Sequence, residues 1–105
     1  MKIFPLNYKI SGIKIEVPFS AICSITDKSF YGFILVEYQP DKKILEYMSL
    51  EQEITSITKK SITTEDLAKT IFDEIIKITN PKKLKVLVDV RKSKAHQPVQ
   101  VWIEN

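Results

Sequence analysis

The chain has 105 residues, of which 44% are apolar, and its formal net charge is +3 at pH 7. A chain of this length is expected to fold as one domain over residues 1–105, with one core and little room for a deep pocket of its own. The mild basicity, carried by fifteen lysines and one arginine, permits a nucleic-acid partner without requiring one. No run of about 18 apolar residues occurs, so we expect no membrane span.

The amino terminus and the cysteine content bear on localisation. The opening "MKIFPLNYKI" lacks the long apolar run and the small-residue cleavage site of a signal peptide. Cys23 is the only cysteine, so the chain can form no internal disulfide. Both observations favour the cytoplasm, where thiols stay reduced.

The first half of the chain predicts strands. Residues 2–17, "KIFPLNYKISGIKIEV", mix β-branched and polar side chains around a Ser11-Gly12 turn and predict a strand or a hairpin. Residues 31–38, "YGFILVEY", are almost continuously apolar, as in a strand buried on both faces. A turn signal, "PDKK", follows. Residues 43–48, "KILEYM", are then predicted to be the return strand of an antiparallel hairpin.

Two helices are predicted in the middle of the chain. Ser49 stands before "LEQEITSITK" with a glutamine three residues on, a capping-box spacing that predicts a helix over about 50–59. Thr63 or Thr64 is predicted to cap a second helix over about 65–79.

The second predicted helix carries a wide apolar face. Glu65 and Asp66 lie in its first turn, where the helix dipole favours negative charge. Asn80 and Pro81 are expected to end it. An apolar face of this width must lie against a sheet. Its members are Leu67, Ala68, Ile71, Phe72, Ile75, Ile76 and Ile78.

Two alternating segments complete the chain. Residues 84–90, "LKVLVDV", and 99–103, "VQVWI", place every second apolar residue on one face, and the segment between them is expected to form a hairpin loop. The predicted order is ββααββ. This order indicates an α+β fold, with an antiparallel sheet and two helices layered on one face.

Four residues are candidates for chemistry on their own properties. Cys23 is the only strong nucleophile, but a lone cysteine among apolar residues is more often buried packing. Asp27 could be a nearby acid or simply a turn residue. Glu65 could be a dipole partner, or its carboxylate could accept two N–H bonds from a base edge. His96 is expected at the surface of a hairpin loop, and one cysteine and one histidine cannot make a zinc site.

Three segments resemble the tunnel-fold nitrile reductases of the QueF family. "FSAICSIT" (19–26) is similar to the segment around the catalytic cysteine of that family. "VEYQPDKKILEYMSL" (36–50) is similar to its hairpin and following motif, and "TEDLAKTIFDEIIKITNPKKLKV" (64–86) to its second helix and next strand. The resemblance extends over about residues 15–90. It implies a tunnel fold whose ββααββ units assemble into rings, pentamers stacked as a decamer, with sites between subunits.

The resemblance also implies roles for individual residues. Cys23 falls at the position of the nucleophile. Glu65 falls at the position of the glutamate that binds the base, 7-cyano-7-deazaguanine, and Thr64 precedes it where the reductases tend to have histidine. The wall of the substrate site falls on Leu45, Glu46 and Tyr47.

One departure from the reductases concerns the cofactor. Where they carry lysines that contact the nicotinamide cofactor, this chain has Met48 and Glu51, which remove the charge complement for phosphate groups. The short archaeal QueF-like proteins also lack those lysines. They are archaeosine synthases, which use ammonia to convert the nitrile, already placed in transfer RNA, into an amidine. The resemblance therefore implies this activity, with no cofactor.

A second departure concerns the acid. The family has an aspartate seven residues after the cysteine, and this chain has Phe30 there. Asp27 is the only carboxylate in the loop and is the candidate replacement. Two other functions stay open: a non-catalytic tunnel-fold protein that binds a deazapurine or transfer RNA, and an NADPH-dependent nitrile reductase.

Overall fold

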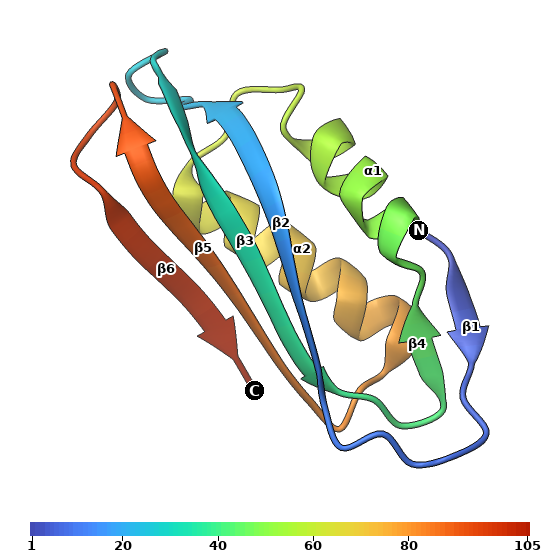
Figure 1. Cartoon of the computed structure of the whole chain (residues 1–105). Coiled ribbons are helices and arrows are strands. Elements are labelled where there is room, and N and C mark those ends of the chain that lie inside the picture. The colour runs from blue at the N-terminus through green and yellow to red at the C-terminus, as the bar shows by residue number, and fades with distance from the viewer.

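The computed structural model describes residues 1–105 as a four-stranded antiparallel sheet with two helices on one face and a small two-stranded sheet beside it (Figure 1). The α+β prediction, with helices layered on one face, is confirmed. The elements in chain order are β1 (Ile3–Pro5), β2 (Ile13–Ile22), β3 (Ser29–Gln39), β4 (Lys43–Leu45), α1 (Tyr47–Ile57), α2 (Thr64–Thr79), β5 (Lys83–Ser93) and β6 (Val99–Glu104).

The main sheet has the order β2-β3-β5-β6, and every neighbouring pair is antiparallel. Side chains alternate between its faces, so residues paired across the strands share a face. One such row runs through Val17, Ile34, Val88 and Val101, which pair in sequence across the four strands. This row points toward the helices and forms the sheet side of the core.

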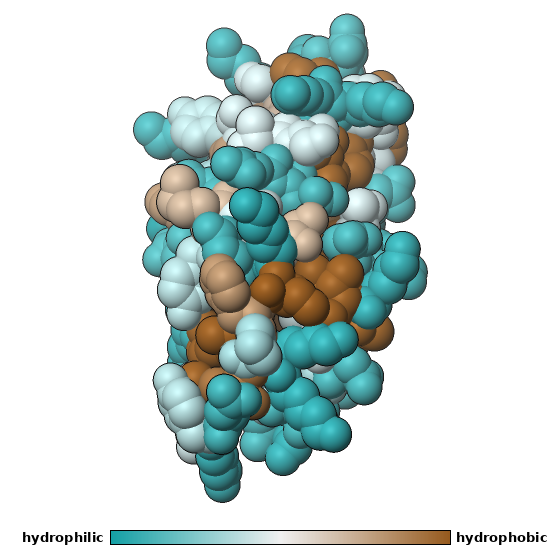
Figure 2. All heavy atoms as spheres, turned by 90° about the vertical axis from the view of Figure 1, so that its right-hand side faces the viewer, coloured by the Kyte–Doolittle hydropathy of each residue, from teal (hydrophilic) through white to brown (hydrophobic).

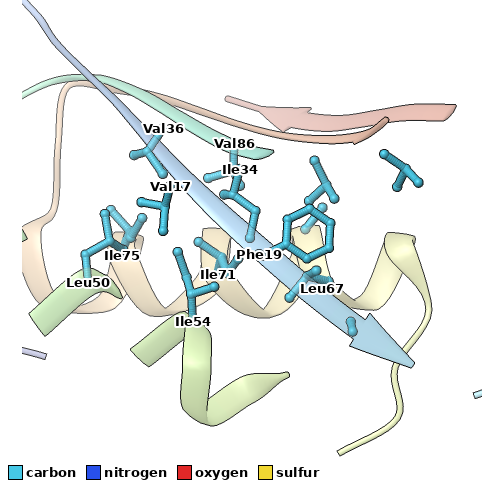
Figure 3. Packing of buried hydrophobic residues seen from close by; sticks show 14 of the residues in the cluster. Val17, Phe19, Ile34, Val36, Leu50, Ile54, Leu67, Ile71, Ile75 and Val86 are labelled. Carbon is cyan, nitrogen blue, oxygen red and sulfur yellow. The ribbon is translucent and has the colours of Figure 1, made fainter. Parts of the chain in front are cut away.

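The core lies between the sheet and the two helices (Figure 3). Three buried positions of the predicted α2 stripe, Leu67, Ile71 and Ile75, recur every four residues and contact the sheet. Full burial of each such side chain stabilises the fold by about 1.5–3 kcal/mol. The labelled core residues are Val17, Phe19, Ile34, Val36, Leu50, Ile54, Leu67, Ile71, Ile75 and Val86.

The return strand predicted for residues 43–48 is wrong, and of the two alternatives for residues 2–17, a strand or a hairpin, the hairpin does not form. β1 does not pair with β2, and β4 is not the return strand of β3. Instead β1 and β4 pair with each other, for example Ile3 with Leu45. Both edges of β3 are already occupied, by β2 and β5, so the segment after Pro40 has no free edge of β3 to join. β4 ends at Leu45, and the next residues begin α1.

The first helix begins earlier than the sequence predicts. Its N-cap is Glu46, whose carboxylate accepts a hydrogen bond from the backbone N–H of Ser49. Ser49 is therefore inside the first turn, where its hydroxyl donates to the Glu46 carbonyl oxygen at 2.9 Å. The predicted ends of α2 are confirmed: Thr63 caps it through Asp66 N–H at 3.1 Å, and Asn80 ends it in the left-handed conformation, with φ of 46°.

Candidate active site at the end of the sheet

A cavity of about 390 Å³ lies where the β2–β3 loop, the start of α2 and the β5–β6 loop meet, at the upper end of the sheet in Figure 1. Its volume lies within the range of small-molecule pockets, roughly 300–1,000 Å³. A larger open cleft of about 550 Å³ at the opposite end of the sheet contains no cysteine or histidine. The upper cavity is lined by Cys23, Ile25, Thr63, Thr64, Glu65, His96, Gln97 and Val99.

Cys23 lies just after β2, at the start of a tight turn. Its N–H donates to the Lys28 carbonyl oxygen at 2.9 Å, and its carbonyl oxygen accepts from the Asp27 N–H at 2.8 Å. The turn folds back over the sulfur, so the side chain is only 4% exposed although it lines the cavity.

The turn also lowers the pKa of the Cys23 thiol below its ordinary value. The main cause is a hydrogen bond from the backbone N–H of Thr26, with further hydrogen bonds from the Thr26 hydroxyl and the Ile25 N–H. Burial and the nearby Glu65 carboxylate oppose this shift without reversing it. A stabilised thiolate is the reactive form of cysteine, so Cys23 has the environment of a nucleophile.

Asp27, the candidate acid, lies outside the lining of this cavity. Its side chain is exposed, and its backbone is left-handed, with φ of 61°. Aspartate is one of the few residues that adopt this conformation readily. In the structure Asp27 therefore shapes the turn that surrounds Cys23.

The first turn of α2 supplies the opposite wall. Thr64 is 3% exposed, and its Oγ1 is the one buried side-chain oxygen or nitrogen without a hydrogen-bond partner. Glu65 follows it, and neither of the two ion pairs in the chain involves Glu65. An unpaired buried hydroxyl costs free energy unless a ligand satisfies it. Cys23, Thr64 and Glu65 line the same cavity.

His96 lies in the β5–β6 hairpin loop, as predicted, and is half-buried there, a position whose role the sequence interpretation did not identify. His96 lines the cavity, and its imidazole packs on Phe30 with ring centroids 5.8 Å apart. Ser93 Oγ holds the loop by accepting the N–H groups of Ala95 and His96, each at 3.0 Å. The available signal was Ser93 three residues before His96, a spacing at which a serine hydroxyl orders a local turn.

Leu45, Glu46 and Tyr47 do not reach this cavity within one chain. They lie at the junction of β4 and α1, on the other side of the molecule in Figure 1. Leu45 is buried and Glu46 caps α1, whereas the Tyr47 side chain is 56% exposed. The structure thus brings together Cys23, Thr64 and Glu65 but not the predicted substrate wall.

Two general findings bear on binding partners. Neither helix has the length and apolar character needed to cross a membrane. No group of three or more His, Cys, Asp or Glu side chains is positioned to hold a metal ion.

Comparison with solved structures shows the fold. The crystal structure of the archaeosine synthase QueF-Like in the apo form superposes with a TM-score of 0.83 at 22% identity, over 92% of this chain and 95% of that chain. The likeness extends over nearly the whole of both chains, so it confirms the predicted tunnel fold.

Comparison with known sequences shows the family. The NADPH-dependent 7-cyano-7-deazaguanine reductases of Elusimicrobium minutum and Sulfurovum sp. are 35% and 32% identical, over 73% and 79% of this chain. The chain spans 59% and 65% of the length of those two relatives. The family described as "QueF-like protein" matches residues 30–97, which include Glu65 and His96 and begin after Cys23. The chain therefore belongs to the QueF-like protein family.

Proposed function

We propose that this chain is an archaeosine synthase, which converts the nitrile of 7-cyano-7-deazaguanine in transfer RNA into an amidine by adding ammonia. The observation that carries the proposal is one cavity lined by a thiol of lowered pKa, Cys23, and by the free carboxylate of Glu65. The family membership and the substrate in the names of the relatives support a nitrile-bearing deazaguanine as the ligand.

The proposed chemistry divides one difficult addition into two steps. The Cys23 thiolate attacks the nitrile carbon, a carbon–sulfur bond forms, and one π bond of the nitrile breaks to give a covalent thioimide. Ammonia then adds to the same carbon, and the thiolate leaves with its electron pair. The product is the amidine, and the thiolate is regenerated without any change in oxidation state.

The start of α2 suits the recognition of the base. The Glu65 carboxylate can accept two parallel N–H bonds from the guanine-like edge, an arrangement that fixes orientation as well as affinity. The unpartnered Thr64 hydroxyl is available for a further hydrogen bond. Holding the nitrile against the sulfur in the right orientation can supply several kcal/mol of the barrier.

A neighbouring copy of the chain completes the site in this proposal. Leu45, Glu46 and Tyr47 lie far from their own chain's cavity, so they can form a substrate wall only for another subunit. We propose a homo-oligomer, in pentamers stacked as a decamer, acting on transfer RNA in the cytoplasm. The lysines would contact RNA phosphates, so binding should weaken steeply as salt concentration rises.

An NADPH-dependent nitrile reductase is the second candidate, because the relatives carry that name. The start of α1 argues against it, since Met48 and Glu51 are exposed there and offer no positive charge to a cofactor phosphate. Oxidation of NADPH by the purified protein with the free nitrile base would favour reduction. We expect no such oxidation.

The first test of the proposed function is the intact mass of the protein after mixing with free 7-cyano-7-deazaguanine at neutral pH. We expect an adduct of the mass of the base on the wild type and none on Cys23→Ser. With ammonium and transfer RNA carrying the base, the wild type should form the amidine. Absence of any wild-type adduct, or amidine formation by Cys23→Ala, would contradict the covalent mechanism.

The second test isolates the carboxylate. Glu65→Gln should weaken binding of the base by about 10- to 100-fold, the value of a hydrogen bond to a charged group. Asp66→Asn is the matched control, because it removes the same charge from the same helical turn but does not line the cavity. Equal losses of affinity in the two variants would mean that only the charge of the helix terminus matters.

A further inference from the structure

The proposed thioimide step needs a proton that the predicted acid does not supply within this cavity. When the thiolate attacks, the electron pair of the broken π bond moves to the nitrile nitrogen, which must be protonated. Asp27 lies outside the cavity lining and is exposed. At the position of the family aspartate, Phe30 is completely buried and packs edge-on against Phe19, at 5.8 Å between ring centroids. Neither residue brings an acidic group to the nitrile.

The residue that packs on Phe30 from the cavity side is His96. Its ring lies 5.8 Å from that of Phe30 and tilted by 43°, and it lines the same cavity as Cys23 and Glu65. Cys23 and Glu65 are the other titratable side chains that line the cavity, and they come from the β2–β3 loop and from α2. His96, on the β5–β6 loop, therefore lies in the cavity next to Phe30, which has no acidic group to offer.

The hydrogen bonds of His96 leave one ring nitrogen free for proton transfer. Its Nδ1 lies 2.7 Å from the Gln97 carbonyl oxygen, which can only accept, so Nδ1 carries a hydrogen. Nε2 is then the atom that gains and loses a proton. The backbone is held by Ser93 Oγ, and the ring by Phe30, so the orientation of the imidazole is fixed from two sides.

We propose that His96 is the catalytic acid of the thioimide step, an assignment that rests on the proposed function. The imidazolium Nε2–H gives its proton to the nitrile nitrogen as the Cys23 sulfur bonds to the carbon. The products of this step are the neutral thioimide and neutral imidazole. In the second step the imidazole takes a proton from the attacking ammonia, and the thiolate departs. The Cys23 thiolate and the His96 imidazolium are thereby regenerated. Protons and electrons balance over the cycle with no other reactant.

The experiment compares two reactions of the same sulfur. Thioimide formation with the free nitrile base requires an acid, whereas alkylation by iodoacetamide expels iodide and requires none. His96→Gln and His96→Phe should slow thioimide formation by about 100- to 10,000-fold, yet leave alkylation of Cys23 within about threefold of wild type. His96→Phe keeps an aromatic ring against Phe30, so two variants with different packing protect the test against misfolding of one.

A matched control tests whether the effect belongs to His96. Lys94→Gln, on the same loop as His96 but outside the cavity lining, should form the thioimide at close to the wild-type rate. A wild-type thioimide rate in His96→Gln, or an equal loss of both reactions, overturns the assignment while the proposed function stands. A wild type that forms no thioimide overturns both.

Discussion

At the scale of single residues, the reactivity of Cys23 depends on the backbone that follows it. The turn from Cys23 to Lys28 directs the N–H groups of Ile25 and Thr26 at the sulfur, and this arrangement lowers the pKa of the thiol. The left-handed conformation of Asp27 closes the turn. Cys23 is therefore buried, as its apolar surroundings indicate, and also activated, which those surroundings do not indicate.

Thr26→Val tests this origin of the lowered pKa. The substitution removes the hydroxyl contribution but keeps the larger one from the Thr26 N–H, so the pKa of Cys23 should rise part of the way toward its ordinary value. The pH at which iodoacetamide alkylation reaches half its maximal rate should rise accordingly. Ser24→Ala, in the same turn and outside the hydrogen bonds to sulfur, is the control. An unchanged alkylation profile in Thr26→Val would contradict the contribution of the hydroxyl.

The candidate site could be predicted only in part from the sequence, for reasons that differ between residues. Cys23, Thr64 and Glu65 are predicted by the resemblance of their segments to the QueF family, and the structure places all three in the lining of one cavity. Thiol activation depends on turn geometry, which a single cysteine in a sequence does not reveal. His96 comes from a hairpin loop far along the chain, and its contact with Phe30 exists only once β3 and β5 are paired.

At the scale of elements, Tyr38 joins the main sheet to the small one. Its hydroxyl oxygen accepts the backbone N–H of Leu45 at 3.0 Å, in the buried region between β3 and β4. Burial raises the pKa of Tyr38 above its ordinary value, and the hydrogen bond from Leu45 opposes part of that rise. The contact fixes the strand that leads directly into Glu46 and Tyr47, so it also positions the proposed substrate wall.

Tyr38→Phe should lower the free energy of unfolding by about 1–3 kcal/mol, because the buried Leu45 N–H loses its partner. Urea denaturation measures this as a lower midpoint with an unchanged slope. Tyr31→Phe is the control, since Tyr31 is 46% exposed and its side chain makes no hydrogen bond within the fold. If the two variants had the same midpoint, the hydroxyl of Tyr38 would not hold β4.

The fold shows which structural information is local. Apolar periodicity and end signals predicted α2 and the strands β3 and β5, because those patterns reflect a buried face within one element. Strand partners are not local, so the pairing of β1 with β4 was missed. The start of α1 was missed because a glutamate, Glu46, occupies the N-cap, where a serine was the expected residue.

At the scale of the whole molecule, the two halves of the proposed site lie apart. The chain is elongated, with extents of 45 × 21 × 18 Å, and the Cys23 cavity lies at one end of the sheet. Figure 2 shows the side that carries α1 and β1, where apolar side chains gather in a band among hydrophilic ones. Tyr47 and Met48, at the start of α1, are 56% and 60% exposed. In the proposed oligomer, a second subunit can close the open cavity and bury these exposed side chains.

Mixed oligomers test whether a site is shared between chains. Cys23→Ser and Tyr47→Ala should each be inactive alone, but refolding them together at equal ratio should restore about a quarter of wild-type activity, because in a head-to-tail ring a site can combine an intact cavity from one chain with an intact wall from the next. Cys23→Ser mixed with Glu65→Gln is the control, since both residues line the cavity of one chain and no mixture can repair it. Native mass spectrometry would confirm that mixed oligomers form. Mixed oligomers that stay inactive in the first pair would show that Tyr47 does not serve a neighbour's site.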